Sequence, residues 1–146
     1  MAEGAYGYGK MGVARMYALV FGIAYLAVGL LELFYGVDDP LLIGDTVLIA
    51  GGTVHIIIHL AVGILVLGSF FAGQSAAKSV ARVVGVVFLI VFALNVFASN
   101  FYAELVGFPN GAKTPIVYTI VHAVTAAGAL FAGFSAGRGY KSAPAA

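Results

Sequence analysis

Residues 51–71 read GGTVHIIIHLAVGILVLGSFF, an apolar run that holds two histidines four positions apart. A helix needs about 20 predominantly apolar residues to cross the hydrocarbon core of a bilayer. This run meets that requirement and contains no Asp, Glu, Lys or Arg. We therefore predict a membrane-spanning helix over 47–71. His55 and His59 should share one face of it, because residues four apart lie on the same side of a helix.

Three further stretches have a similar length and composition: 16–35, 80–98 and 115–134. The segments between them hold turn-forming pairs such as Asp39-Pro40 and Asn110-Gly111. The sequence thus predicts an all-α fold, a four-transmembrane-helix bundle over 16–134 with tails at 1–15 and 135–146. The third loop is rich in aromatic and aliphatic residues, so we expect a short interfacial segment there.

The composition indicates that the protein lies in a membrane. Of the 146 residues, 62% are hydrophobic and only 9% are charged, whereas a soluble domain has about 25% charged residues. The absence of cysteine excludes disulfides, zinc ribbons and thiol catalysis. A net charge of +1 is too small to indicate a nucleic-acid partner. The expected partners are membrane lipids, with other membrane subunits or a second copy of the chain.

The distribution of charge predicts an orientation. Basic residues precede the first span, lie at the second loop and follow the last span. They are Lys10, Arg15, Lys78, Arg82, Arg138 and Lys141. Acidic residues favour the first and third loops, namely Asp38, Asp39, Asp45 and Glu104, where Lys113 is the one basic residue. By the positive-inside rule, both termini should be cytoplasmic and the protein integral to the cytoplasmic (inner) membrane. Four spans also require both termini on one side.

Each predicted span has one stripe of small and polar residues among bulky aliphatic ones. A rise of about 1.5 Å per residue places four polar side chains at a similar depth in the outer half of the bundle, namely Glu32, Asn95, His55 and His122. His59 lies one turn deeper, and Tyr118 and Thr119 stand beside His122 as supporting residues. Because polar groups in a membrane bundle face its interior, the stripes are expected to face one another.

The histidines admit several interpretations. Neutral imidazoles could hydrogen-bond within the bundle and fix its register. Haem b could bind between His122 and either His55 or His59, since two axial ligands must come from opposite helices. A metal could bind to His55, His59, His122 and Glu32, because three nitrogens and one oxygen suit zinc, iron or copper. A proton or quinone site is a further alternative.

No nucleophilic triad, paired catalytic carboxylates or nucleotide-binding fingerprint is present in the sequence. We therefore expect a protein that is not an enzyme. The first expectation is a non-enzymatic accessory or structural subunit of a larger membrane complex, because a small chain with short loops has little extramembrane mass. The alternative is a haem- or metal-binding membrane protein that uses the buried histidine cluster.

Two motifs carry a family resemblance. GGTVHIIIHLAVGILVL (51–67) resembles a signature of the domain-of-unknown-function 4383 family, small bacterial and mainly actinobacterial membrane proteins with four predicted spans. The matching residues are His55, His59, Leu60 and Gly63, and His122 in YTIVHAVTAAG (118–128) stands where that family has a fourth-span histidine. The first span, YALVFGIAYLAVGLLELF, is also similar. The resemblance covers about residues 12–134 and implies four spans without implying an activity.

The chain departs from that family pattern in two places. Gly51 and Gly52 stand where an asparagine is expected before the first histidine, and no acidic residue shortly precedes His122. Both departures remove candidate hydrogen-bond partners from a shared metal site.

Overall fold

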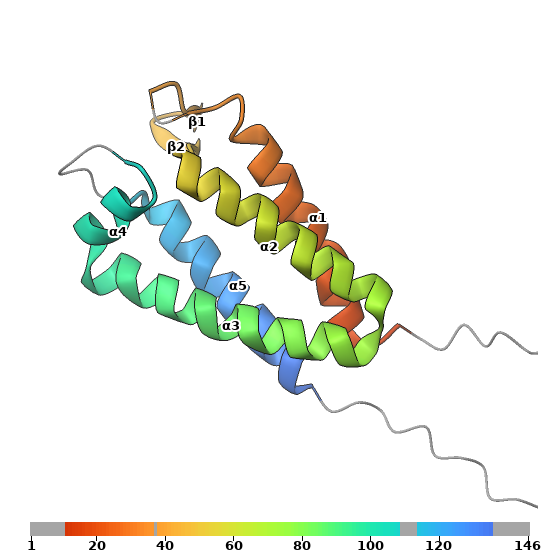
Figure 1. The fold of residues 1–146 in the computed structure, drawn as a ribbon. Coiled ribbons are helices and arrows are strands. Elements are labelled where there is room, and N and C mark those ends of the chain that lie inside the picture. The colour runs from red at the N-terminus through yellow and green to blue at the C-terminus, as the bar shows by residue number, and fades with distance from the viewer. Residues whose placement is uncertain (1–10, 37, 109–113, 136–146) are drawn as a thin grey trace, which may run out of the picture.

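The computed structural model describes residues 11–36, 38–108 and 114–135, and it confirms the all-α four-helix bundle (Figure 1). Besides the four long helices, the described residues form one short helix and one β-hairpin. The elements are α1 (Val13–Leu31), β1 (Leu41–Ile43), β2 (Thr46–Ile49), α2 (Thr53–Ala72), α3 (Gln74–Phe97), α4 (Ser99–Leu105) and α5 (Ile116–Phe134). The short helix α4 lies in the third loop, where the sequence predicts one.

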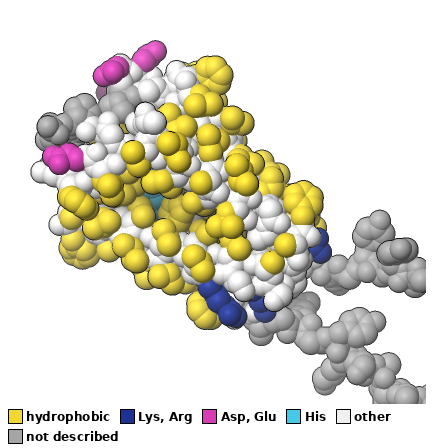
Figure 2. Space-filling view, in the orientation of Figure 1, with side chains coloured by type: hydrophobic (Ala, Val, Ile, Leu, Met, Phe, Trp, Pro, Cys, Tyr) yellow, Lys and Arg dark blue, Asp and Glu magenta, His cyan; other side chains and the backbone are white. Residues whose placement is uncertain are grey.

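The four long helices are each long and apolar enough to cross a membrane, by length and composition. Large aliphatic and aromatic side chains are exposed along the bundle, as expected for a surface covered by lipid tails (Figure 2). Figure 2 also shows acidic side chains at one end and basic side chains at the other. We call the end with β1, β2 and α4 the hairpin end. The opposite end, where α1 begins and α5 finishes, is the tail end (Figure 1).

The starts of α2 and α3 differ from the sequence prediction for local reasons. Residues from Val47 onward do not begin α2, because β2 pairs antiparallel with β1 instead. Gly44 makes the turn between them at φ +59°, a conformation that glycine adopts readily. At the other end of α2, Gly73 alone separates α2 from α3, at φ +104°. The segment expected as a second loop is therefore the first turns of α3.

The bundle consists of two helical hairpins with related sequences. α1 packs most extensively on α2, and α3 on α5. Identical residues recur 63 positions apart in the two pairs, among them Gly22 and Gly85, His59 and His122, Leu67 and Leu130, and Phe71 and Phe134. Since α1 and α3 run in the same direction, the chain is a parallel tandem repeat (Figure 1).

The two helices of each hairpin cross in the same way. A Cβ atom at Gly22 would lie 2.7 Å from the backbone nitrogen of Leu67, and one at Gly85 would lie 2.9 Å from that of Leu130. Each glycine thus lets its helix approach the next at van der Waals distance, as small residues do in membrane bundles.

At the tail end, basic side chains satisfy free carbonyl groups at helix ends. Arg15 Nε donates to the carbonyl of Phe70 at 3.1 Å, and Arg82 Nε donates to the carbonyl of Gly133 at 2.8 Å. Phe70 and Gly133 are equivalent positions of the repeat. The tail half of the core is mostly apolar, with Ser69 as a buried polar residue there, and most of the other buried polar residues lie toward the hairpin end.

Replacing Gly22 with alanine is expected to lower the free energy of unfolding by about 1–3 kcal/mol, because the added methyl group forces α1 and α2 apart. Gly68→Ala provides the matched control, since a Cβ at Gly68 meets nothing within 4 Å. Thermal or denaturant unfolding in one detergent measures both variants. Equal stabilities for the two would contradict the close crossing at Gly22.

Candidate metal centre

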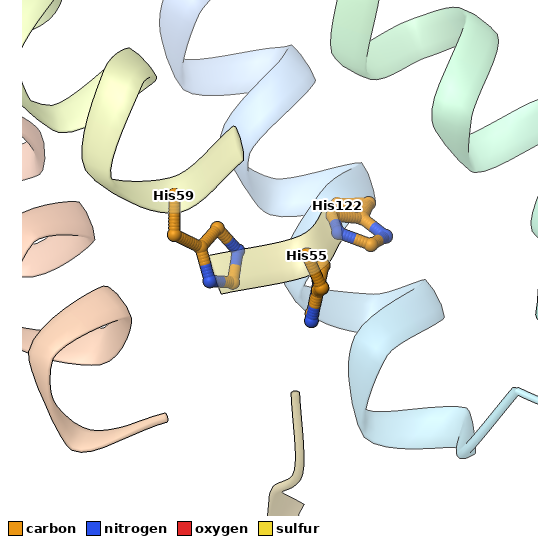
Figure 3. Close-up of side chains that lie close together, drawn as sticks. All are labelled: His55, His59 and His122. Carbon is orange, nitrogen blue, oxygen red and sulfur yellow. The ribbon is translucent and has the colours of Figure 1, made fainter. Parts of the chain in front are cut away.

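Three buried histidines from two helices lie together near the hairpin end. His55 and His59 lie one turn apart on α2, and His122 approaches from α5, in the other helical hairpin (Figure 3). Their side chains are almost wholly buried. Each ring contributes one nitrogen atom to a set whose members lie within 4.8 Å of one another. If the distances between these nitrogen atoms shortened modestly, all three could bind one zinc ion in a tetrahedral site.

Glu32 bridges the two histidines of α2. It follows the last residue of α1 and is 2% exposed. Its Oε2 atom lies 2.9 Å from His59 Nδ1 in a hydrogen bond, and its Oε1 atom lies 3.1 Å from His55 Nδ1. Gly51 makes this position possible, because a Cβ there would lie 2.9 Å from the Glu32 side chain.

The carboxylate favours one tautomer of each α2 histidine. A carboxylate only accepts hydrogen bonds, so it favours a proton on Nδ1 and leaves the lone pair of a neutral imidazole on Nε2. Among the described residues, neither ring nitrogen of His55 has a well-aligned hydrogen-bond partner. His55 therefore has unused binding capacity in a buried place, where unmet polar groups are costly.

His122 has a different partner. Asn95 on α3 places its side-chain nitrogen 3.1 Å from His122 Nδ1 and 2.9 Å from the carbonyl oxygen of Val91. Asn95 and His122 stand 63 positions beyond Glu32 and His59, so the same pair of equivalent positions is in contact in each half of the repeat. In the second half the polar residue is an amide and not a carboxylate.

Tyrosines enclose the cluster. The Tyr118 hydroxyl donates to the carbonyl of Ala50 at 2.7 Å and accepts from the Ala50 amide at 2.6 Å, which ties α5 to the start of α2. Its ring stacks on His55 at 5.4 Å between centroids. Tyr102 on α4 presents its ring edge-on to His122 at 5.9 Å. Burial raises the pKa of the Tyr102 hydroxyl to about 12, so it stays neutral.

A cavity of about 290 Å³ adjoins the cluster. Its polar wall is formed by the three histidines, Glu32 and Tyr118, and its other wall by aliphatic residues, namely Val28, Leu48, Ile49, Val117 and Val121. A histidine side chain is visible between hydrophobic side chains toward the hairpin end of the face in Figure 2. The cluster thus borders a space large enough for an additional small ligand.

This geometry suits a single ion better than a haem. Haem needs two axial histidines on opposite sides of the macrocycle. With nitrogens of all three rings within 4.8 Å of one another, the third ring would lie in the area that the macrocycle occupies. An ion accepts three converging nitrogens without that clash.

The structure brings together most of the residues predicted from the sequence. Glu32, His55 and His59 form one contact group, and Asn95 joins His122. Thr119 makes no side-chain hydrogen bond among the described residues. The sequence reasoning missed Gly51, the Tyr118–Ala50 bonds and Tyr102. The spacing of 63 positions between His59 and His122 would have revealed the paired arrangement.

Replacing Tyr118 with phenylalanine is expected to destabilise the protein by about 1–3 kcal/mol, because both backbone groups of Ala50 would be left buried without their partner. Tyr17→Phe is the matched control, since the Tyr17 hydroxyl is buried and unpartnered in the described chain. Hydrogen exchange at the Ala50 amide, combined with thermal unfolding, reports the effect. An unchanged exchange rate in Tyr118→Phe would count against the tie.

No protein-family model matches the chain, and comparison with curated proteins and with solved structures finds no match. The resemblance to the domain-of-unknown-function 4383 family stays a prediction.

Proposed function

We propose that this integral membrane protein binds one divalent transition-metal ion, zinc in the first instance, through His55, His59 and His122. The observation that carries the proposal is the contact of one carboxylate, Glu32, with the Nδ1 atoms of two histidines of a buried three-histidine cluster. Histidines that bind metals commonly donate their other ring N–H to a carboxylate, which orients the ring and raises its basicity.

The chemistry of the ligand atoms limits the choice of ion. Three imidazole nitrogens suit zinc, copper or iron, whereas calcium and magnesium prefer oxygen ligands. Glu32 supplies a compensating negative charge beside the cluster, which lowers the cost of burying a divalent cation. In this proposal Glu32 acts as a positioning residue behind the histidines, a change from its expected place among the ligands. The cavity beside the cluster leaves room for water or a small ligand at a fourth position.

The orientation belongs to the proposal. With both termini cytoplasmic, the hairpin end and the histidine cluster face the outer half of the bilayer. Exposed Asp38, Asp39 and Asp45 at the hairpin end support this assignment and would raise the local concentration of cations. A reporter fused to the C-terminus that is active only outside the cytoplasm should be inactive, and an active one would reverse the orientation.

Metal analysis of the purified protein tests the binding. The protein is extracted into lipid nanodiscs, treated with a chelator, reloaded with zinc and desalted. We expect about one zinc per chain for the wild type and none for His55→Ala/His122→Ala, with Gly68→Ala as a folded control. A wild-type protein that retains no zinc, or a double variant that retains as much as wild type, would refute the proposal.

Native mass spectrometry of gently extracted protein addresses the other expectation. A large assembly with no added mass on this chain would favour the accessory-subunit prediction over the metal site. A single chain or a small homo-oligomer that carries the mass of an ion would favour the metal site.

A further inference from the structure

The repeat places Asn95 where the first half has Glu32, and this exchange reverses the polarity of one hydrogen bond. Glu32 accepts from His59 Nδ1, whereas the Asn95 amide nitrogen carries two protons and can only donate. One of these donations goes to Val91 and the other to His122 Nδ1. The two equivalent histidines are therefore held in opposite ways.

The consequence for His122 follows from its chemistry. A neutral imidazole has one N–H and one lone pair. Because His122 Nδ1 accepts from Asn95, its proton belongs on Nε2. In His59 the proton is on Nδ1 and Nε2 is free to bind. His122 makes no other side-chain hydrogen bond among the described residues. Besides His55 and His59, its close neighbours are the aromatic rings of Phe88, Tyr102 and Tyr118.

Asn95 also has an unused group. Its Oδ1 atom is buried and has no hydrogen-bond partner within the described chain. A half-turn of the amide would bring Oδ1 to His122 Nδ1 and let that nitrogen carry the proton. His122 Nε2 would then be free, at the cost of the hydrogen bond to Val91.

We propose that Asn95 is a positioning residue that decides whether His122 serves as a metal ligand. This inference rests on the proposed metal function. In the free protein the amide holds His122 with its proton on Nε2, and only His55 and His59 are ready to bind. Ion binding at His122 requires the amide to turn and the proton to move from Nε2 to Nδ1, with no net change in proton number. Asn95 thus lowers the affinity of the site relative to a carboxylate.

Two variants of similar shape test this. Asn95→Asp presents an acceptor to His122 Nδ1 at all times and is expected to tighten zinc binding about 10- to 100-fold, the range typical of changes to the residues behind metal ligands. Asn95→Leu removes the donor without supplying an acceptor, so it should bind zinc less tightly than Asn95→Asp. Competition against a chelator of known affinity measures all three proteins. Equal affinities for wild type and Asn95→Asp would overturn the inference.

A second readout does not depend on metal. Nitrogen-15 NMR of histidine-labelled protein in lipid bilayers distinguishes protonated from unprotonated ring nitrogens. Without metal, His122 should carry its proton on Nε2 in the wild type and on Nδ1 in Asn95→Asp. A wild-type His122 already protonated on Nδ1 would overturn the inference even if zinc binds. Failure of wild type and every variant to bind zinc would refute the proposed function. The NMR result alone would then decide whether Asn95 donates to His122 Nδ1.

Discussion

Replacing Glu32 with glutamine is expected to weaken zinc binding about 10- to 100-fold without unfolding the protein. Glutamine keeps the shape of the side chain but replaces one carboxylate oxygen with a donating amide nitrogen. One of the two α2 histidines would then face a donor at Nδ1, as His122 does, and would keep its proton on the nitrogen needed for the ion. Competition with a chelator measures the loss.

Glu104→Gln is the matched control for this change. Glu104 lies on α4 and is exposed, so the same substitution there removes one negative charge from the hairpin end without contact with a histidine. We expect its zinc affinity to stay within a factor of about two of wild type, since charges on the surface are screened by salt. Similar losses in the two variants would mean that Glu32 acts through overall charge and not through contact.

The largest effect on stability is expected when both α2 histidines are replaced by leucine. Glu32 would then be a buried carboxylate without its two partners, and an unpaired buried charge costs about 3–5 kcal/mol. Adding Glu32→Leu to that double variant removes the charge and should recover most of the loss. Reversible unfolding in mixed detergent micelles measures the series, and the difference defines the coupling between Glu32 and the histidines.

Two outcomes would contradict the buried position of Glu32. A His55→Leu/His59→Leu variant as stable as wild type would mean that the carboxylate reaches water or lipid headgroups. A triple variant no more stable than the double would assign the loss to packing around the histidines and not to the charge. Metal-free protein is used throughout, so that an ion bound to the wild type does not add to its stability.

Much of the fold follows from hydropathy and spacing alone. Runs of about 20 apolar residues predict the four long helices, and the separation of His55 and His59 by four positions predicts their common face. The β-hairpin could not be predicted in this way. Residues 46–49 are as apolar as the helix that follows, and only the turn at Gly44 and Asp45 separates the strand from a helical interpretation.

The site was predictable in part. A similar depth for Glu32, Asn95, His55 and His122, with His59 one turn deeper, follows from helical rise. Which residue contacts which depends on how each helix is rotated about its axis, and that rotation is set by close crossings such as Gly22 against Leu67. The burial of Glu32 also depends on Gly51, one of two glycines that stand where the family resemblance leads one to expect an asparagine. These contacts join positions far apart in the chain, so local patterns do not reveal them.

The tandem repeat has a consequence for how such a site can arise. Two identical two-helix chains that met as a homodimer would be encoded by one gene, and any change beside one histidine would appear beside its symmetry mate. Duplication and fusion of that gene releases the constraint. Each half can then diverge, and here Glu32 and His55 lie on one side while Asn95 and Tyr118 occupy the equivalent places on the other. The asymmetry around the histidines is therefore one that a homodimer of identical two-helix chains could not hold.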